Sequence, residues 1–117
     1  MYQSIYSEMA TETTATIRDD ERLALEHSIR LLEAAKRKGR GSTESVKALL
    51  FLSRLWAVLL EDLAGPDNGL PDTLRASLIS IGIWMLRRAE DISQGESHEY
   101  QALIDVSQSI SDGLKRN

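Results

Sequence analysis

Hydrophobic residues recur along this chain with the period of an α-helix, in four segments separated by short stretches that hold nearly all the glycine. The first helix is expected from about Thr16 to Lys38, with Leu25, Ile29 and Leu32 on one stripe. Acidic residues lie near its start and basic residues at its end, which complements the helix dipole. The pattern predicts a helix that packs through one face.

The sequence Gly39-Arg40-Gly41 is expected to end that helix, and Ser42 or Thr43 to cap a second one that runs to about Ala64. Its apolar stripe is too wide for one neighbour, so we expect this helix to be central and to contact at least two others. The stripe consists of Val46, Leu49, Leu50, Leu52, Leu55, Trp56, Leu59, Leu60 and Leu63.

Residues 65–71 form the next break, and Pro71 suits the first position of a third helix that runs to about Ser93. This helix has almost no polar residues through its middle, which predicts that it is the most buried element. Gly82 within it costs about 1 kcal/mol of helix propensity relative to alanine, so we expect a close helix–helix contact there.

Gly95 is expected to end the third helix and Ser97 to cap a last one that reaches about Leu114. Its narrower apolar stripe is typical of an outer helix. Four helices joined by short loops predict an all-α, up-and-down bundle that forms a single domain over residues 1–117.

The amino-terminal segment adds a short helical arm to this bundle. Tyr2, Ile5, Tyr6 and Met9 share one helical face, whereas residues 11–16 have poor helix propensity. Two interpretations stay open. The segment is either a short helix or turn docked permanently on the bundle, or a mobile arm over residues 1–15 that covers an apolar groove and moves aside for a partner.

The amino-acid composition limits the kinds of function that this chain can have. The chain has no cysteine, which excludes disulfides and thiolate chemistry, and its 18 acidic against 14 basic residues disfavour nucleic acid and anionic membranes as partners. The longest uncharged run, between Arg75 and Arg87, is well short of the roughly 20 residues that span a bilayer. The first residues lack the features of a secretory signal, so we expect a cytoplasmic protein without membrane insertion.

Catalytic patterns are missing from the sequence. His27 and His98 belong to different helices, and neither lies in a Glu-x-x-His pair of the kind that binds metal in bundles. The pairs Glu61-Asp62 and Glu90-Asp91 are adjacent in sequence, so their carboxylates do not face each other on a helix. We therefore expect no enzymatic activity, no metal and no cofactor.

Trp56 and Trp84 have two interpretations. Each could fill the core, with its indole N–H bonded to a partner at the rim. Alternatively, both line a binding groove, because tryptophan is over-represented among residues that carry binding energy.

Residues 49–56, with the sequence Leu-Leu-Phe-Leu-Ser-Arg-Leu-Trp, resemble the core of FlaF proteins. The resemblance covers nearly the whole chain in order. Its other parts are Met1-Tyr2-Gln3, Glu61-Asp62-Leu63, Pro66-Asp67-Asn68, Leu70-Pro71, Leu74-Arg75-Ala76, residues 78–84 and Leu103-Ile104-Asp105.

The resemblance implies a cytoplasmic role in bacterial flagellum biogenesis, as a chaperone and regulator that associates with flagellin and influences its synthesis and its delivery for export. The terminal segments of flagellin are amphipathic and unfolded before export, and a bundle with a surplus apolar groove can hold such a helix. We expect this client-binding groove between the second and third helices. Its predicted residues are Trp56, Leu59, Leu63, Ile81, Trp84 and Met85.

Two alternatives remain. A post-transcriptional regulator would contact flagellin messenger RNA through the basic run 36–40, although no aromatic residue lies within that run. An adaptor would instead recruit another flagellar assembly factor.

Overall fold

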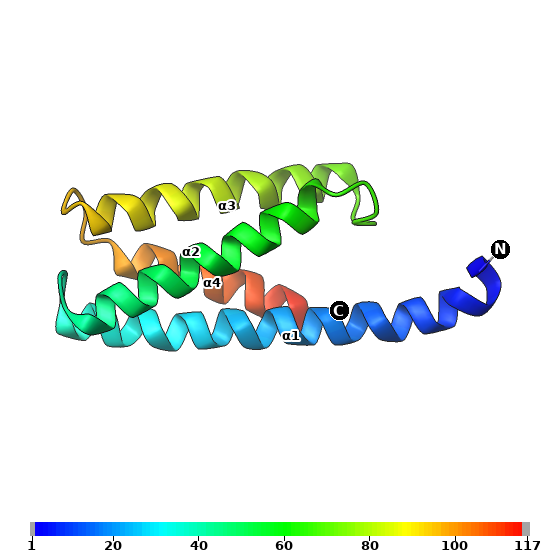
Figure 1. The fold of residues 1–117 in the computed structure, drawn as a ribbon, viewed down its shortest axis with the longest axis horizontal. Coiled ribbons are helices and arrows are strands. Elements are labelled where there is room, and N and C mark those ends of the chain that lie inside the picture. Colours follow the sequence, from blue (N-terminus) through cyan, green and yellow to red (C-terminus); the bar gives the residue numbers. More distant parts are fainter. Residues whose placement is uncertain (1, 116–117) are drawn as a thin grey trace.

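The computed structural model describes the backbone of residues 2–115 and the side chains of residues 19–114. Over this range the chain forms four helices and no strand, which confirms the all-α class. They form an elongated bundle in which the first helix is the longest (Figure 1). The helices are α1 (Tyr2–Lys38), α2 (Thr43–Ala64), α3 (Asp72–Ser93) and α4 (Tyr100–Lys115).

The ends of α2 follow the predicted signals. Ser42 is the N-cap, and its Oγ accepts a hydrogen bond from the Ser45 amide at 3.1 Å and donates one to the Gly39 carbonyl at 2.7 Å. This side chain therefore both starts α2 and fixes the turn after α1. Pro71 lies one position earlier than predicted, because it precedes α3 as the N-cap residue instead of opening the helix.

Two helix starts differ from the prediction. α1 begins at Tyr2 instead of about Thr16 and continues without a break through the threonine-rich stretch. α4 begins at Tyr100, because Ser97 Oγ accepts a hydrogen bond from the Glu99 amide and forms a separate turn first.

The first part of α1 extends past the ends of the other three helices (Figure 1). The predicted covering residues Tyr2, Ile5, Tyr6 and Met9 lie on this part. Their side chains are outside the described residues, so the role of the arm stays a prediction.

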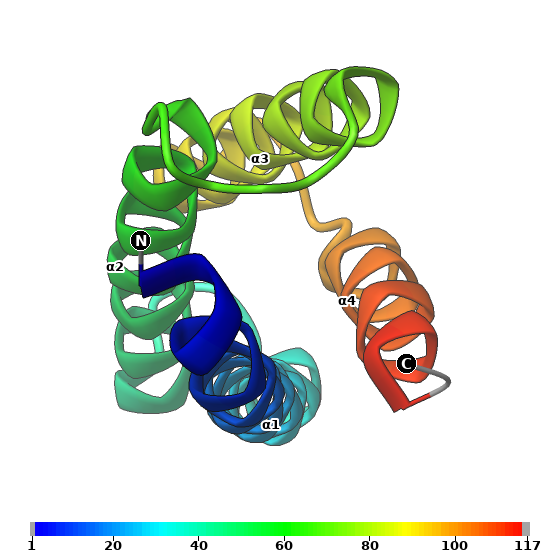
Figure 2. The same cartoon turned by 90° about the vertical axis from the view of Figure 1, so that its right-hand side faces the viewer.

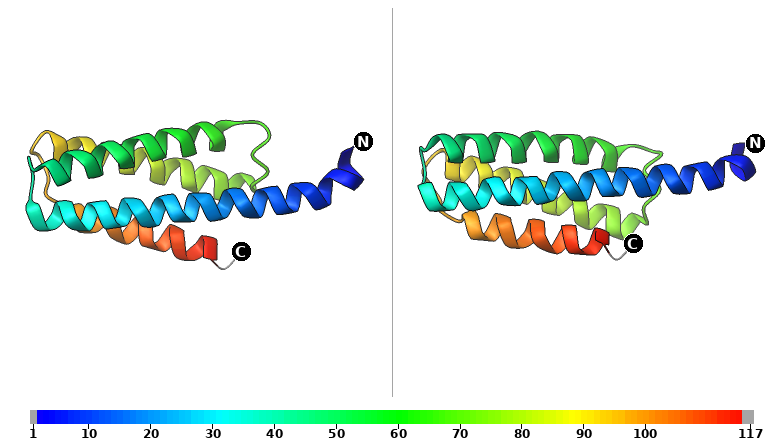
Figure 3. Two further views of the ribbon diagram at one scale, coloured as in Figure 1. Left: turned by 60° about the horizontal axis from the view of Figure 1, so that its bottom comes forward. Right: turned by 90° about the horizontal axis from the view of Figure 1, so that it is seen from below.

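The four helices do not pack equally. α1 contacts α2 and α4 extensively, and α2 contacts α1 and α3, which confirms that α2 touches two neighbours. α3 and α4 have few contacts with each other, and they separate as they leave their connecting loop (Figures 1 and 2). By contrast, α1 lies alongside both α2 and α4 (Figure 3, left). The bundle is therefore closed on three sides and only partly closed on the fourth.

The core reflects this arrangement. It is built mainly by α1, α2 and α4, with Leu32, Leu52 and Leu103 fully buried. The buried residues of α3 are Gly82 at its midpoint and Met85, Ala89 and Ile92 in its second half. The expectation that α3 is the most buried element is therefore wrong, because α3 has one extensive helix contact, with α2.

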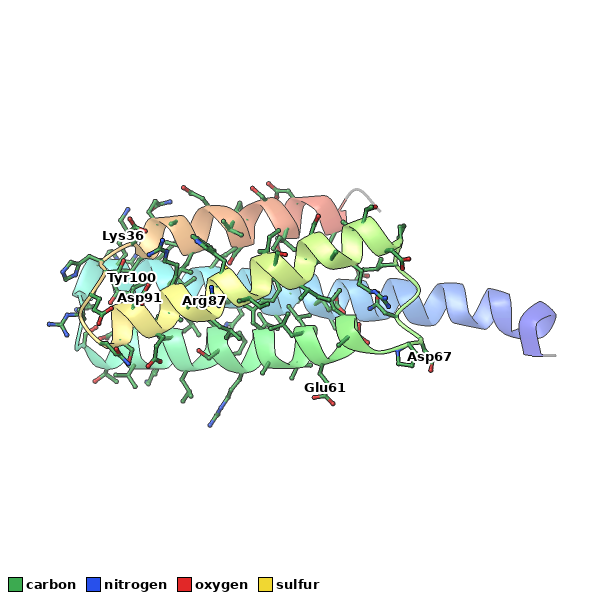
Figure 4. All side chains as sticks on the ribbon, turned by 90° about the horizontal axis from the view of Figure 1, so that it is seen from above. Lys36, Glu61, Asp67, Arg87, Asp91 and Tyr100 are labelled. Atoms are coloured by element: carbon green, nitrogen blue, oxygen red, sulfur yellow. The ribbon has the colours of Figure 1, made fainter. Side chains whose placement is uncertain are left out.

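Polar contacts join the helices near the loop between α3 and α4. Tyr100 Oη and Ser45 Oγ lie 2.6 Å apart in the buried interior and connect α4 to α2. Lys36 Nζ donates to Gln101 Oε1 at 2.7 Å, which connects α1 to α4, and Figure 4 shows Lys36 and Tyr100 at this end. The Arg88 guanidinium lies 3.9 Å from the Glu99 carboxylate and connects α3 to the residue before α4.

Candidate functional site

α2 and α3 approach each other closely at Gly82. A Cβ atom at this position would lie 2.7 Å from Leu60 Cδ2 and 2.8 Å from Trp56 Cε3. Both distances are below van der Waals contact, so a larger residue would require the Leu60 side chain and the Trp56 ring to shift. The close helix contact predicted for Gly82 is confirmed.

The six predicted groove residues divide into two sets. Trp56, Leu63 and Met85 are buried in the core, with exposed fractions of 1%, 6% and 0%. Leu59, Ile81 and Trp84 are half-buried and pack against that core. A partner could therefore reach the second set on the folded protein, whereas the first set supports it from beneath.

Ile81 and Trp84 lie on the helix face from which Arg88 reaches the start of α4. Arg88 follows them by seven and four residues, so the three side chains share one face of α3. Arg88 pairs with Asp91 of α3 at 3.4 Å, and it also lies 3.9 Å from the carboxylate of Glu99, next to the start of α4. From the second contact we infer that this face of α3 turns toward α4. Gly82 faces α2 instead.

Val106 and Ile110 supply the opposing surface from α4. They follow Glu99 by seven and eleven residues, from which we infer that they lie on the face of α4 that turns toward α3. Both are half-buried and pack against the core. We call the surface formed by Ile81, Trp84, Val106 and Ile110 the α3–α4 side.

Leu59 shows that the interior is accessible next to this side. It lies seven residues after Leu52 and four before Leu63, so all three share the inner face of α2. Leu52 and Leu63 are buried, but Leu59 between them is only half-buried. An inward-facing leucine that keeps solvent contact indicates that α3 and α4 do not fully cover the core at this level.

The two tryptophans have different environments. Trp84 is half-buried, and the Arg88 guanidinium lies 5.8 Å from the centroid of its ring, within the range of a cation–π contact. Trp56 fills the core, but its Nε1 has no hydrogen-bond partner within the described part of the chain. The expected rim partner for the Trp56 indole is therefore wrong, whereas Trp84 does lie at the rim.

The remaining polar candidates are dispersed. His27 and His98 are exposed, and the His27 ring contacts the Phe51 ring edge-on at 4.8 Å. Among residues 19–114 no group of histidine and acidic side chains has the arrangement of a metal site. No described helix is long and apolar enough to cross a membrane.

The basic run 36–40 lies at the end of the bundle where the loops meet. Lys36, Arg37 and Lys38 are exposed, and the Arg40 guanidinium packs over Gly95 of the loop between α3 and α4. Lys36 is engaged with Gln101. These charged side chains surround the C-terminal end of α1 and are not gathered on one face of the bundle.

Sequence reasoning did not include Val106 or Ile110 among the site residues. Both belong to the helix predicted as outer, and their four-residue spacing was the available signal. The missing information was which face of α4 turns toward α3, and only the ion pair between Arg88 and Glu99 supplies it.

The structure thus defines an all-α helical bundle in which α3 and α4 have few contacts with each other. Comparison with protein families supplies the identity: the model of the family described as flagellar protein FlaF matches residues 2–114. The chain belongs to the FlaF family. No curated protein and no solved structure matched it significantly.

Proposed function

We propose that this protein is a non-catalytic flagellin-binding chaperone and regulator, which holds an amphipathic flagellin segment in the cytoplasm before export and thereby influences flagellin synthesis. Membership of the FlaF family gives the flagellar context. The half-burial of Ile81, Trp84, Val106 and Ile110 between two helices with few mutual contacts supports a binding role.

The α3–α4 side suits a helical segment with one apolar face. An incoming helix would contact both α3 and α4 and cover the four side chains that the bundle leaves half-exposed. Each Å² of apolar surface removed from water contributes roughly 25 cal/mol, so the gain rises with the length of helix that docks. The client's own apolar face would be covered at the same time, which would limit its aggregation.

The buried residues beneath this side hold it in place. Trp56 packs against Gly82, and Met85 and Leu103 are fully buried. A preformed surface of this kind needs little reorganisation to bind.

A pull-down tests the proposal. The full chain should retain full-length flagellin, and the complex should disappear when the terminal flagellin segment that carries the amphipathic helix is deleted. Undiminished capture of flagellin that lacks both terminal segments would rule out this mechanism. Capture of a different flagellar assembly factor without flagellin would favour the adaptor instead.

A further inference from the structure

A second surface lies on the outer face of α2, away from the α3–α4 side. Val58 is 66% exposed and is the most exposed of the large apolar side chains. Arg54 precedes Val58 by four residues and Glu61 follows it by three, so the three side chains lie along one face within two turns. All three are exposed, as is Ala57.

The charges of this surface have no partners within the described chain. Arg54, Glu61 and Asp67 form no ion pair, whereas Arg75 is engaged with Asp72. Glu61 points away from the bundle, and Asp67 lies in the loop after α2 (Figure 4). An isolated cation and an isolated anion therefore flank an exposed valine.

A shallow hollow accompanies the acidic end of this surface. Glu61, Asp62 and Asp67 contribute three carboxylates to its lining, and Val58 forms its apolar edge. The Arg75 guanidinium reaches the Gly65 carbonyl at 3.4 Å but pairs with Asp72 outside the lining. The hollow thus offers a negative site for a guanidinium from outside the chain. Its lining is Val58, Glu61, Asp62, Gly65, Pro66, Asp67 and Asn68.

We propose that this surface binds a second copy of the same chain through antiparallel packing of two α2 helices. A twofold axis near Ala57 and Val58 places Arg54 of each copy against Glu61 and the hollow of the other. The same ion pair then forms twice, once on each side of the twofold axis, as an isologous interface requires. The two valines would pack on each other at the centre, where the small Ala57 side chain allows close approach.

The exposed leucines extend this contact. Leu50 is 48% exposed and lies one turn before Arg54 on α2, and Leu23 of α1 is 54% exposed. The contact between His27 and Phe51 sets the antiparallel register of α1 and α2, which places Leu23 at the level of Leu55, about one turn before Val58. This patch has far fewer side chains than the roughly 20–30 per partner of a standard stable interface, so the dimer should be weak and reversible. Exposed charge pairs also make it sensitive to salt.

Charge reversal tests this pairing in the full chain. Sedimentation equilibrium from about 10 µM to about 1 mM should show a monomer–dimer equilibrium that weakens as salt is raised. Arg54→Glu and Glu61→Arg should each raise the dissociation constant by about tenfold or more, because each puts like charges opposite one another. The double variant Arg54→Glu/Glu61→Arg should restore dimerisation, because the pairing is retained with its signs exchanged.

Arg87→Glu is the matched control, because Arg87 is an exposed arginine on α3, outside this face. It should leave the dissociation constant within about twofold of the unsubstituted chain. A chain that stays monomeric throughout the concentration range would overturn the proposal. So would a double variant that dimerises no better than the single variants. Circular dichroism confirms that each variant is folded.

Discussion

Gly82 of α3 lies directly against the Trp56 ring of α2, and a Cβ atom on Gly82 would come within 2.8 Å of Trp56 Cε3. This contact sets the distance between α2 and α3 and holds Trp56 in the core. The α3–α4 side is built on this contact, because Ile81 and Trp84 flank Gly82 along α3. A residue with no side chain therefore determines where the proposed binding surface lies.

Gly82→Ala should lower the free energy of unfolding by about 1–3 kcal/mol, the usual cost of overpacking, despite the better helix propensity of alanine. Gly113→Ala is the matched control, because Gly113 also lies in a helix and a Cβ there would have no atom within 4 Å. It should raise the free energy of unfolding by up to about 1 kcal/mol. Urea denaturation measures both, and equal effects of the two substitutions would disprove the close packing at Gly82.

Tyr100→Phe should destabilise the protein by about 1–2 kcal/mol, because it leaves the buried Ser45 Oγ without its 2.6 Å partner. In a Ser45→Ala background the same substitution should cost much less, since no hydrogen bond remains to be lost. A double-mutant cycle from urea denaturation gives the coupling energy. Additive effects would show that the two hydroxyl groups do not interact.

The two tryptophans should differ in their access to solvent. Trp56 is 1% exposed, whereas Trp84 is half-buried at the α3–α4 side. Acrylamide should therefore quench the fluorescence of a Trp56→Phe variant, which retains Trp84, more strongly than that of a Trp84→Phe variant. Addition of the flagellin segment should reduce quenching of Trp84 and leave Trp56 unchanged. Unchanged or stronger quenching of Trp84 on addition of the segment would contradict the proposed binding surface.

The α2 boundaries were predictable because their signals are local. Ser42 caps the helix and Gly65 follows its last residue, as expected from the residue types alone. The start of α1 was missed because threonine propensities differ from those of good helix formers by well under 1 kcal/mol per residue. A helix already formed downstream can extend through such a stretch, since propagation costs much less than nucleation.

Two features were not predictable from one sequence: how deeply α3 is buried, and which of the predicted groove residues are buried in the core and which are half-buried. Ile81 and Met85 are both apolar residues in the middle of α3, but Met85 is fully buried and Ile81 is not. Apolar content shows that a helix has surface to bury, and it does not show how many neighbours are available. The weak contact between α3 and α4 depends on the whole fold and decides which of these residues a partner can reach.

The binding account depends on one face of α3. Ile81 lies on the α3–α4 side, whereas Ile83 is exposed, at 43%, on a different face two residues later. The most direct measurement is the affinity of Ile81→Ser and Ile83→Ser variants for a terminal flagellin segment by isothermal titration calorimetry, with folding checked by circular dichroism. The account predicts that Ile81→Ser weakens binding by about tenfold or more and that Ile83→Ser leaves it within about twofold. Equal affinities for the two variants, or a larger loss at Ile83, would contradict it.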